Sequence, residues 1–175
     1  YKGKWYGDCF KDPAKPWHLI RKSSDALYQI IKQLMLMDKL EACQASSIHA
    51  KTEWLEGTRR LADAFVNIWR RYGQFGQFIN TSSGDIIIGG STSGGIAPAG
   101  LALAWQYFGD DAYIEVAREA MEYYYDNYVE KGISTGGPGE ILQCPDSESA
   151  FGLLESFIIL YETTCERQWL DKAIE

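Results

Sequence analysis

Tyr113-Ile114-Glu115-Val116-Ala117-Arg118 has two counterparts in this chain, Trp54-Leu55-Glu56-Gly57-Thr58-Arg59 and Trp169-Leu170-Asp171-Lys172-Ala173. The first residues of successive copies lie 59 and 56 positions apart. Each copy runs through an aromatic, an aliphatic, an acidic, a variable and a small position. Self-similarity at a period of this size is typical of repeat proteins, in which each repeat is one supersecondary unit.

Each copy opens a segment with helical amphipathicity. Between 53 and 72 the apolar side chains recur at helical spacing, and the charged residues lie largely outside that stripe. The segment 112–128 has the same pattern. Such helices bury one face and expose the other to water. We therefore expect these segments to form an outer layer of helices.

The segments before them differ, because they are apolar on nearly every side. Residues 150–161 carry almost no polar side chain, and 96–107 combines apolar with small residues. A helix that is hydrophobic all round must be buried all round. The segment 24–40 supplies an inner helix for the first copy. The sequence thus predicts an all-α chain of three inner–outer hairpins over about 24–72, 96–129 and 147–175, with helices at 24–40, 53–72, 96–107, 112–129, 147–161 and 167–175.

The lengths of the loops between the expected helices predict where functional residues would lie. Short turns join inner to outer helices, whereas long loops at 73–95 and 130–146 lead back to the next inner helix. All long loops then lie at the same end of the helices, the end where the inner helices begin. We call this end the rim. Within 73–95, two alternating stretches flank Thr81-Ser82-Ser83-Gly84, which predicts a small β-hairpin. Residues 1–23 are expected to be irregular.

Composition excludes several classes of partner. The net charge of −7 disfavours nucleic acid and anionic membranes, and no run approaches the ~20 apolar residues of a membrane span. The four cysteines form no CxxC pair, and both histidines are isolated. We expect neither a metal site nor a cofactor. Because disulfides remain open as an alternative, the cellular compartment is not assigned.

Three carboxylates near one inner-helix start are the candidate catalytic residues. They are Glu140, Asp146 and Glu148, which follow a glycine-rich turn. Cleavage of a glycosidic bond needs one acid to protonate the leaving oxygen and one carboxylate to activate water or to attack. The competing interpretation is structural, because Asp is a favoured N-cap and Asp146 directly precedes the expected helix.

Polar and aromatic residues at the same rim are candidate substrate contacts. Ser91, Thr92 and Ser93 lie in a glycine-rich turn, and Ser91 and Ser93 align with Ser147 and Ser149 at a spacing of 56. A helix-capping turn is the alternative interpretation. Aromatic rings suit the apolar faces of sugars. Candidates of this kind in the irregular N-terminal segment are Trp5, Tyr6 and Trp17.

The repeat resembles the six-hairpin (α/α)6-toroid glycosidase superfamily over about residues 24–175. The likeness lies in the apolar inner helix, the turn Gly109-Asp110-Asp111 and the outer starts at Tyr113 and Trp169, together with Arg60-Leu61-Ala62-Asp63-Ala64. It implies a carbohydrate-active enzyme: a glycoside hydrolase with acidic residues, or a polysaccharide lyase acting on uronic acids. Its substrate would be an oligosaccharide or polysaccharide. The superfamily's loop carboxylates correspond here to Asp146, Glu148 and Glu140.

Three hairpins are half of such a ring. We therefore expect this chain to associate with a further chain segment or with a copy of itself, since an open row would leave an apolar flank exposed. An open solenoid is the structural alternative. A non-catalytic sugar-binding scaffold and a protein-binding adaptor are the functional alternatives, because a fold does not determine chemistry.

Overall fold

The computed structural model describes Trp5 and residues 14–43, 49–136 and 144–175. This part of the chain is mostly α-helical, which confirms the predicted fold class. The helices are α1 (Ile20–Ala42), α2 (Thr52–Tyr72), α3 (Ala97–Phe108), α4 (Asp111–Tyr124), the π-helical extension η1 (Tyr125–Val129), α5 (Ser147–Thr164) and α6 (Arg167–Ile174). The strands are β1 (Trp17–Leu19), β2 (Phe78–Asn80) and β3 (Ile86–Ile88).

Helix α3 is the centre of the packing. It contacts α1 on one side and α5 on the other, and α4 packs against it as well. Every residue from Ala97 to Ala104 is buried, as the apolar and small composition predicted. Glycines permit close approach of the inner helices, since a Cβ on Gly100 would lie 2.9 Å from the Leu27 side chain. A Cβ on Gly152 of α5 would lie 3.2 Å from the backbone nitrogen of Ile96.

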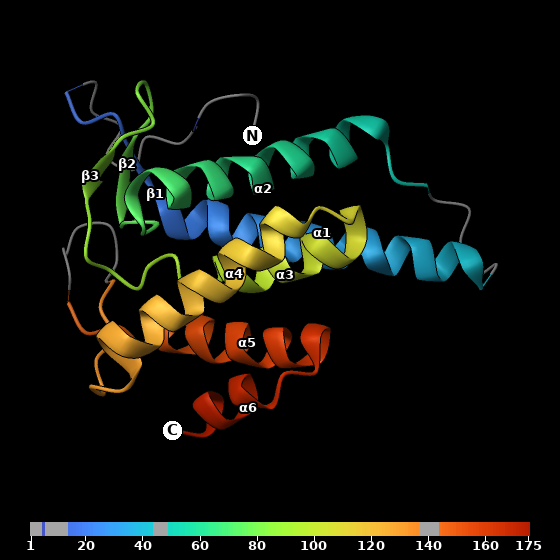
Figure 1. The fold of residues 1–175 in the computed structure, drawn as a ribbon. Coiled ribbons are helices and arrows are strands. Elements are labelled where there is room, and N and C mark those ends of the chain that lie inside the picture. The colour runs from blue at the N-terminus through green and yellow to red at the C-terminus, as the bar shows by residue number, and fades with distance from the viewer. Residues whose placement is uncertain (1–4, 6–13, 44–48, 137–143) are drawn as a thin grey trace.

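The outer helices follow their inner partners in pairs (Figure 1). Helix α2 contacts α1, α4 contacts α3, and α6 contacts α5. Their charged faces are exposed, as expected for amphipathic helices. The sheet lies at the end where α1 and α5 begin, whereas the α3–α4 and α5–α6 turns lie at the opposite end.

The predicted β-hairpin is confirmed, and it has a third strand. Strand β2 pairs antiparallel with β3, and β1 pairs antiparallel with β2. The prediction that all of residues 1–23 are irregular is therefore wrong for 17–23, because β1 ends at Leu19 and α1 begins at Ile20. A three-residue strand is too short to show alternation. In addition, Leu19 provides no side-chain cap that would mark the start of α1.

Helix α5 is less enclosed than α3. Phe151 is 70% exposed and Leu154 is 41% exposed, so one side of this inner helix carries apolar surface. Across the described residues, none of the helices is both long enough and apolar enough to cross a bilayer.

Candidate functional site

A groove lies between the N-terminal halves of α1 and α5, above the start of α3. Its volume is about 470 Å³. Helix α1 contributes charged, phenolic and amide side chains, and α5 contributes acidic side chains and one aromatic ring. The lining residues central to the site are Arg21, Asp25, Tyr28, Glu148, Phe151 and Glu155. The groove therefore lies at the rim where the sequence predicted the functional residues.

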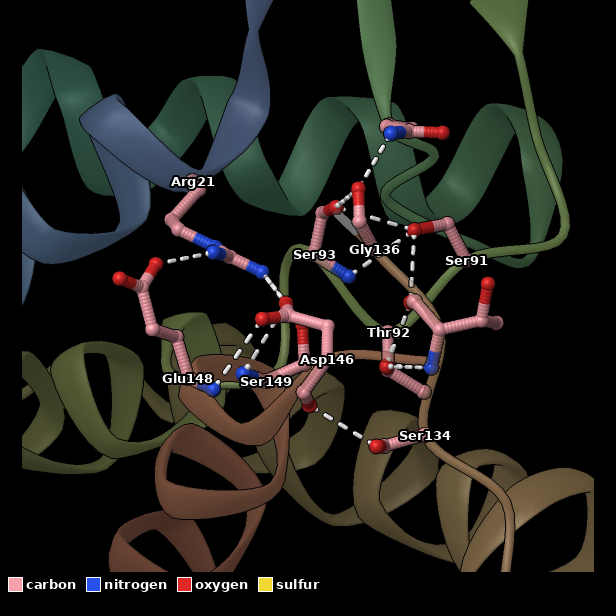
Figure 2. A network of polar contacts seen from close by, with 11 residues as sticks. Arg21, Ser91, Thr92, Ser93, Ser134, Gly136, Asp146, Glu148 and Ser149 are labelled. Atoms are coloured by element: carbon pink, nitrogen blue, oxygen red, sulfur yellow. Dashed lines mark hydrogen bonds and ion pairs between the residues drawn. The ribbon is translucent and has the colours of Figure 1, made fainter. Parts of the chain in front are cut away.

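Asp146 is the N-cap of α5. Its carboxylate accepts hydrogen bonds from the backbone nitrogens of Glu148 and Ser149, both at 3.2 Å. The Ser149 hydroxyl donates to it at 2.6 Å. Arg21 of α1 forms ion pairs with both Asp146 and Glu148, and donates to the Ser149 hydroxyl at 2.6 Å. Figure 2 shows Arg21 reaching across from α1 to these three residues.

This environment favours the capping interpretation for Asp146. Partial burial tends to raise the pKa of Asp146, but hydrogen bonds from Ser149 and Arg21 outweigh it and lower the pKa. The carboxylate is thus held ionised and its oxygens are occupied. A group in this state is poorly suited to donating a proton. Its role in the site is to hold Arg21 and the first turn of α5 in place.

Glu148 differs from Asp146 in its access to solvent. Its side chain is 74% exposed, and one of its oxygens pairs with Arg21. It lies one residue inside α5, where the helix dipole favours a negative charge. A carboxylate that is anchored by a cation yet open to the groove can accept a proton from water or attack an electrophile.

Asp25 is a carboxyl group at the site that sequence reasoning missed. It lies one helical turn after Arg21 on α1 and lines the groove, and the residue is exposed to solvent. Burial among its neighbours is the main cause that raises its pKa, Arg21 opposes the shift, and Glu148 adds to it. The groove thus contains one carboxyl group whose pKa is raised and another that is ion-paired with Arg21.

A hydrogen-bonded chain closes the groove toward the other end of α1. Tyr28 donates to a carboxylate oxygen of Glu155, and Lys32 donates to the Tyr28 hydroxyl at 2.8 Å. Burial, followed by the hydrogen bond to Glu155, raises the pKa of Tyr28 well above its ordinary value. The phenol therefore stays neutral and acts as a donor. Together these residues connect α1 with α5 across the groove.

The serine-rich turn has a mainly structural role. The Ser91, Thr92 and Ser93 side chains are buried. The hydroxyls of Ser91 and Thr92 donate to the carbonyl oxygen of Thr135 at 3.0 and 2.6 Å. That of Ser93 donates to the Gly136 carbonyl at 3.3 Å, and Figure 2 shows this network beside Arg21. Only Thr92 and Ser93 of the three line the groove.

The two candidate aromatic contacts within the described residues, Trp5 and Trp17, do not line the groove. Trp5 is buried, with its ring stacked on His18 at a centroid distance of 5.4 Å, so the expectation of an exposed sugar contact there is wrong. Trp17 lies in β1 and packs against Phe78 of β2. Tyr6 and the third candidate carboxylate, Glu140, lie outside the described residues. Phe151 is the exposed aromatic ring at the groove.

Within the described ranges, no three His, Cys, Asp or Glu side chains are grouped so that they could hold a metal ion. Comparison of the chain with family models, with curated proteins and with solved structures gave no match.

Proposed function

We propose that the groove between α1 and α5 binds a sugar chain and that this protein contributes to glycoside hydrolysis. The observation that carries the proposal is the pairing of two unlike carboxyl groups in one groove. Asp25 comes from α1 with a raised pKa, and Glu148 comes from α5 in an ion pair with Arg21. Hydrolysis of a glycosidic bond requires one protonated carboxyl group, which acts as the acid, and one ionised carboxylate, which acts as the base or nucleophile.

The roles follow from these environments. Asp25 protonates the glycosidic oxygen as the bond to the anomeric carbon breaks. Glu148 either activates the water that attacks that carbon or attacks it directly, and Arg21 keeps its carboxylate in place. Asp146 is a positioning residue, because it acts only through Arg21 and the start of α5. The exposed ring of Phe151 offers an apolar surface against the face of a sugar.

The test is hydrolysis of a panel of oligosaccharides and aryl glycosides, with Asp25→Asn and Glu148→Gln as variants. Each variant should lower turnover about a hundredfold or more with the fold intact. Glu162→Gln is the matched control, because it changes a carboxylate of α5 far from Glu148 and should leave turnover unchanged. Normal turnover in both site variants would overturn the assignment.

The reaction product and measurements of sugar binding distinguish a hydrolase from a lyase and from a non-catalytic sugar-binding scaffold. A polysaccharide lyase would give a product with a new carbon–carbon double bond, detected by its ultraviolet absorbance, and no water would be incorporated. Binding of sugars in calorimetry without turnover would indicate a non-catalytic sugar-binding scaffold. If no oligosaccharide is bound or cleaved, the carbohydrate proposal fails.

A further inference from the structure

Two polar contacts cross from α1 to α5 and bound the groove at both ends. In the first turn of each helix, Arg21 pairs with Glu148. About two helical turns further on, Tyr28 donates a hydrogen bond to Glu155. In both cross-links the α5 residue lies 127 positions after its α1 partner. The two helices therefore run parallel and in register along the groove.

The spacing of the two cross-links sets the length of the groove. Seven residues of α-helix rise about 10 Å, which is the approximate separation of the cross-links along the helix axes. Gly95 and Ile96, which precede α3, line the groove between α1 and α5 and form its floor. Helix α5 packs closely on this floor, since a Cβ on Gly152 would lie 3.2 Å from the backbone nitrogen of Ile96. The groove is thus a short pocket with two closed ends.

The second cross-link separates this pocket from another hollow. That far hollow has a volume of about 570 Å³ and lies between later turns of α1 and α5. Glu155 lines both spaces, whereas Tyr28 lines only the pocket and Lys32 only the far hollow. Tyr28 is 4% exposed, and Lys32 lies over its ring at 4.6 Å and donates to its hydroxyl at 2.8 Å. A buried phenol that both donates and accepts a hydrogen bond is a fixed wall between the two spaces.

We infer that the pocket receives the end of a sugar chain and excludes the middle of one, and that the Tyr28–Glu155 cross-link determines this specificity. The inference rests on the proposed binding of a sugar chain. A volume of about 470 Å³ is in the range of sites that enclose one small ligand. A sugar chain that continued along α1 in either direction would meet a cross-link, so only a terminal unit fits between them.

The cross-link also offers suitable contacts for a terminal sugar. The Tyr28 hydroxyl and the Glu155 carboxylate both accept hydrogen bonds, and the amide of Gln29, which lines the same pocket, both donates and accepts them. Sugar hydroxyls can match either kind of group. With the terminal unit against this wall, the bond to the next unit lies nearer the rim, where Asp25 and Glu148 are found.

Calorimetric binding of matched pairs of linear oligosaccharides tests this inference. Each pair is a free oligosaccharide and the same one blocked by a benzylidene acetal at one end and an aryl group at the other. The wild-type protein should bind the free member about a hundredfold more tightly, because a blocked end does not fit the pocket. Glu155→Ala joins the pocket to the far hollow, so this ratio should fall to about threefold or less. Tyr28→Phe should lower the ratio in the same direction.

Tyr113→Phe is the matched control. Tyr113 is 1% exposed and donates to Asp63 of another helix at 2.6 Å, so this variant loses the same kind of bond away from the pocket. Its ratio should equal that of the wild type. Equal binding of free and blocked oligosaccharides by the wild-type protein would overturn this inference and leave the proposed sugar binding intact, as would an unchanged ratio in Glu155→Ala. If the wild-type protein binds neither member of any pair, the proposed function fails together with this inference.

Discussion

The indole nitrogen of Trp69 donates a hydrogen bond to the carboxylate of Glu119 at 2.7 Å, linking outer helix α2 to outer helix α4. The same contact recurs one repeat later, where Tyr125 donates to Glu175. Both members of the second pair lie 56 positions after those of the first. The period found in the sequence is therefore also a period of tertiary contacts, with an aromatic donor on one outer segment and a glutamate on the next.

Removal of the acceptor should weaken this link. Glu119→Ala leaves the N–H of the buried Trp69 indole without its partner, and we expect a loss of about 1–2 kcal/mol of unfolding free energy. The measurement is the midpoint of urea unfolding. Glu115→Ala on the exposed face of the same helix is the control and should change stability by less than about 0.5 kcal/mol. Equal effects of the two substitutions would contradict the assigned role of the contact.

Asp146 should contribute to stability in a pH-dependent manner. Asp146→Ala removes a helix cap and a partner of Arg21, and we expect a loss of about 2–3 kcal/mol at neutral pH. Because the pKa of Asp146 is lowered in the folded chain, its contribution is present above the ordinary carboxyl pKa and is lost as the pH falls through the lowered value. The gap in melting temperature between wild type and variant should therefore shrink below about pH 4.

The control for Asp146 is Asp171→Ala. Asp171 pairs with Arg167 on the surface of α6, where both side chains are more than half exposed. Exposed pairs of this kind contribute less than about 0.5 kcal/mol. A pH-independent loss in Asp146→Ala would indicate that the ion pair with Arg21 contributes little.

Much of the fold follows from the sequence because the hydrophobic period is strong. The expected helix at 53–72 is observed as Thr52–Tyr72, and the expected 112–129 covers α4 and η1 together. Strand β1 was not predicted, since its existence depends on pairing with β2, some sixty residues away. Long-range pairing of such short strands leaves no local pattern.

The site was predicted only in part, for a similar reason. Asp146 and Glu148 stand at a recognisable helix start, so their position could be inferred. Asp25 was not inferred, because its place in the groove arises from the approach of α1 to α5 across the start of α3. Along α1, Arg21, Asp25 and Tyr28 lie at helical spacing on one face. That polar stripe on an inner helix is the signal that could have identified them.

Gly136 should tolerate no side chain. A Cβ at this position would lie 2.5 Å from the Ser149 hydroxyl and 2.8 Å from both the Arg21 guanidinium and the Ser93 hydroxyl. We expect Gly136→Ala to cost about 1–3 kcal/mol through overpacking, measured by thermal unfolding. Gly57→Ala is the opposite control, because a Cβ there meets no atom within 4 Å and the residue lies inside α2. That substitution should stabilise the helix by up to about 1 kcal/mol.

Asp25→Asn should separate stability from function. The raised pKa of Asp25 means that the folded chain binds this proton more tightly than the unfolded chain, so the ionised wild type loses stability as the pH rises through the raised value. The neutral Asn avoids that loss, and the variant should melt at or above the wild-type temperature at neutral pH. The difference should disappear below about pH 4, where both side chains are uncharged.

If Asp25 is the proton donor, the same variant loses turnover. Glu148→Gln should then shift the alkaline limb of any residual activity to lower pH, because a negative neighbour that raises the pKa of Asp25 is gone. Asp126→Asn changes an exposed carboxylate far from the groove and should alter neither melting nor turnover. A variant that loses stability and activity together at neutral pH would show that Asp25 is needed for packing rather than for proton transfer.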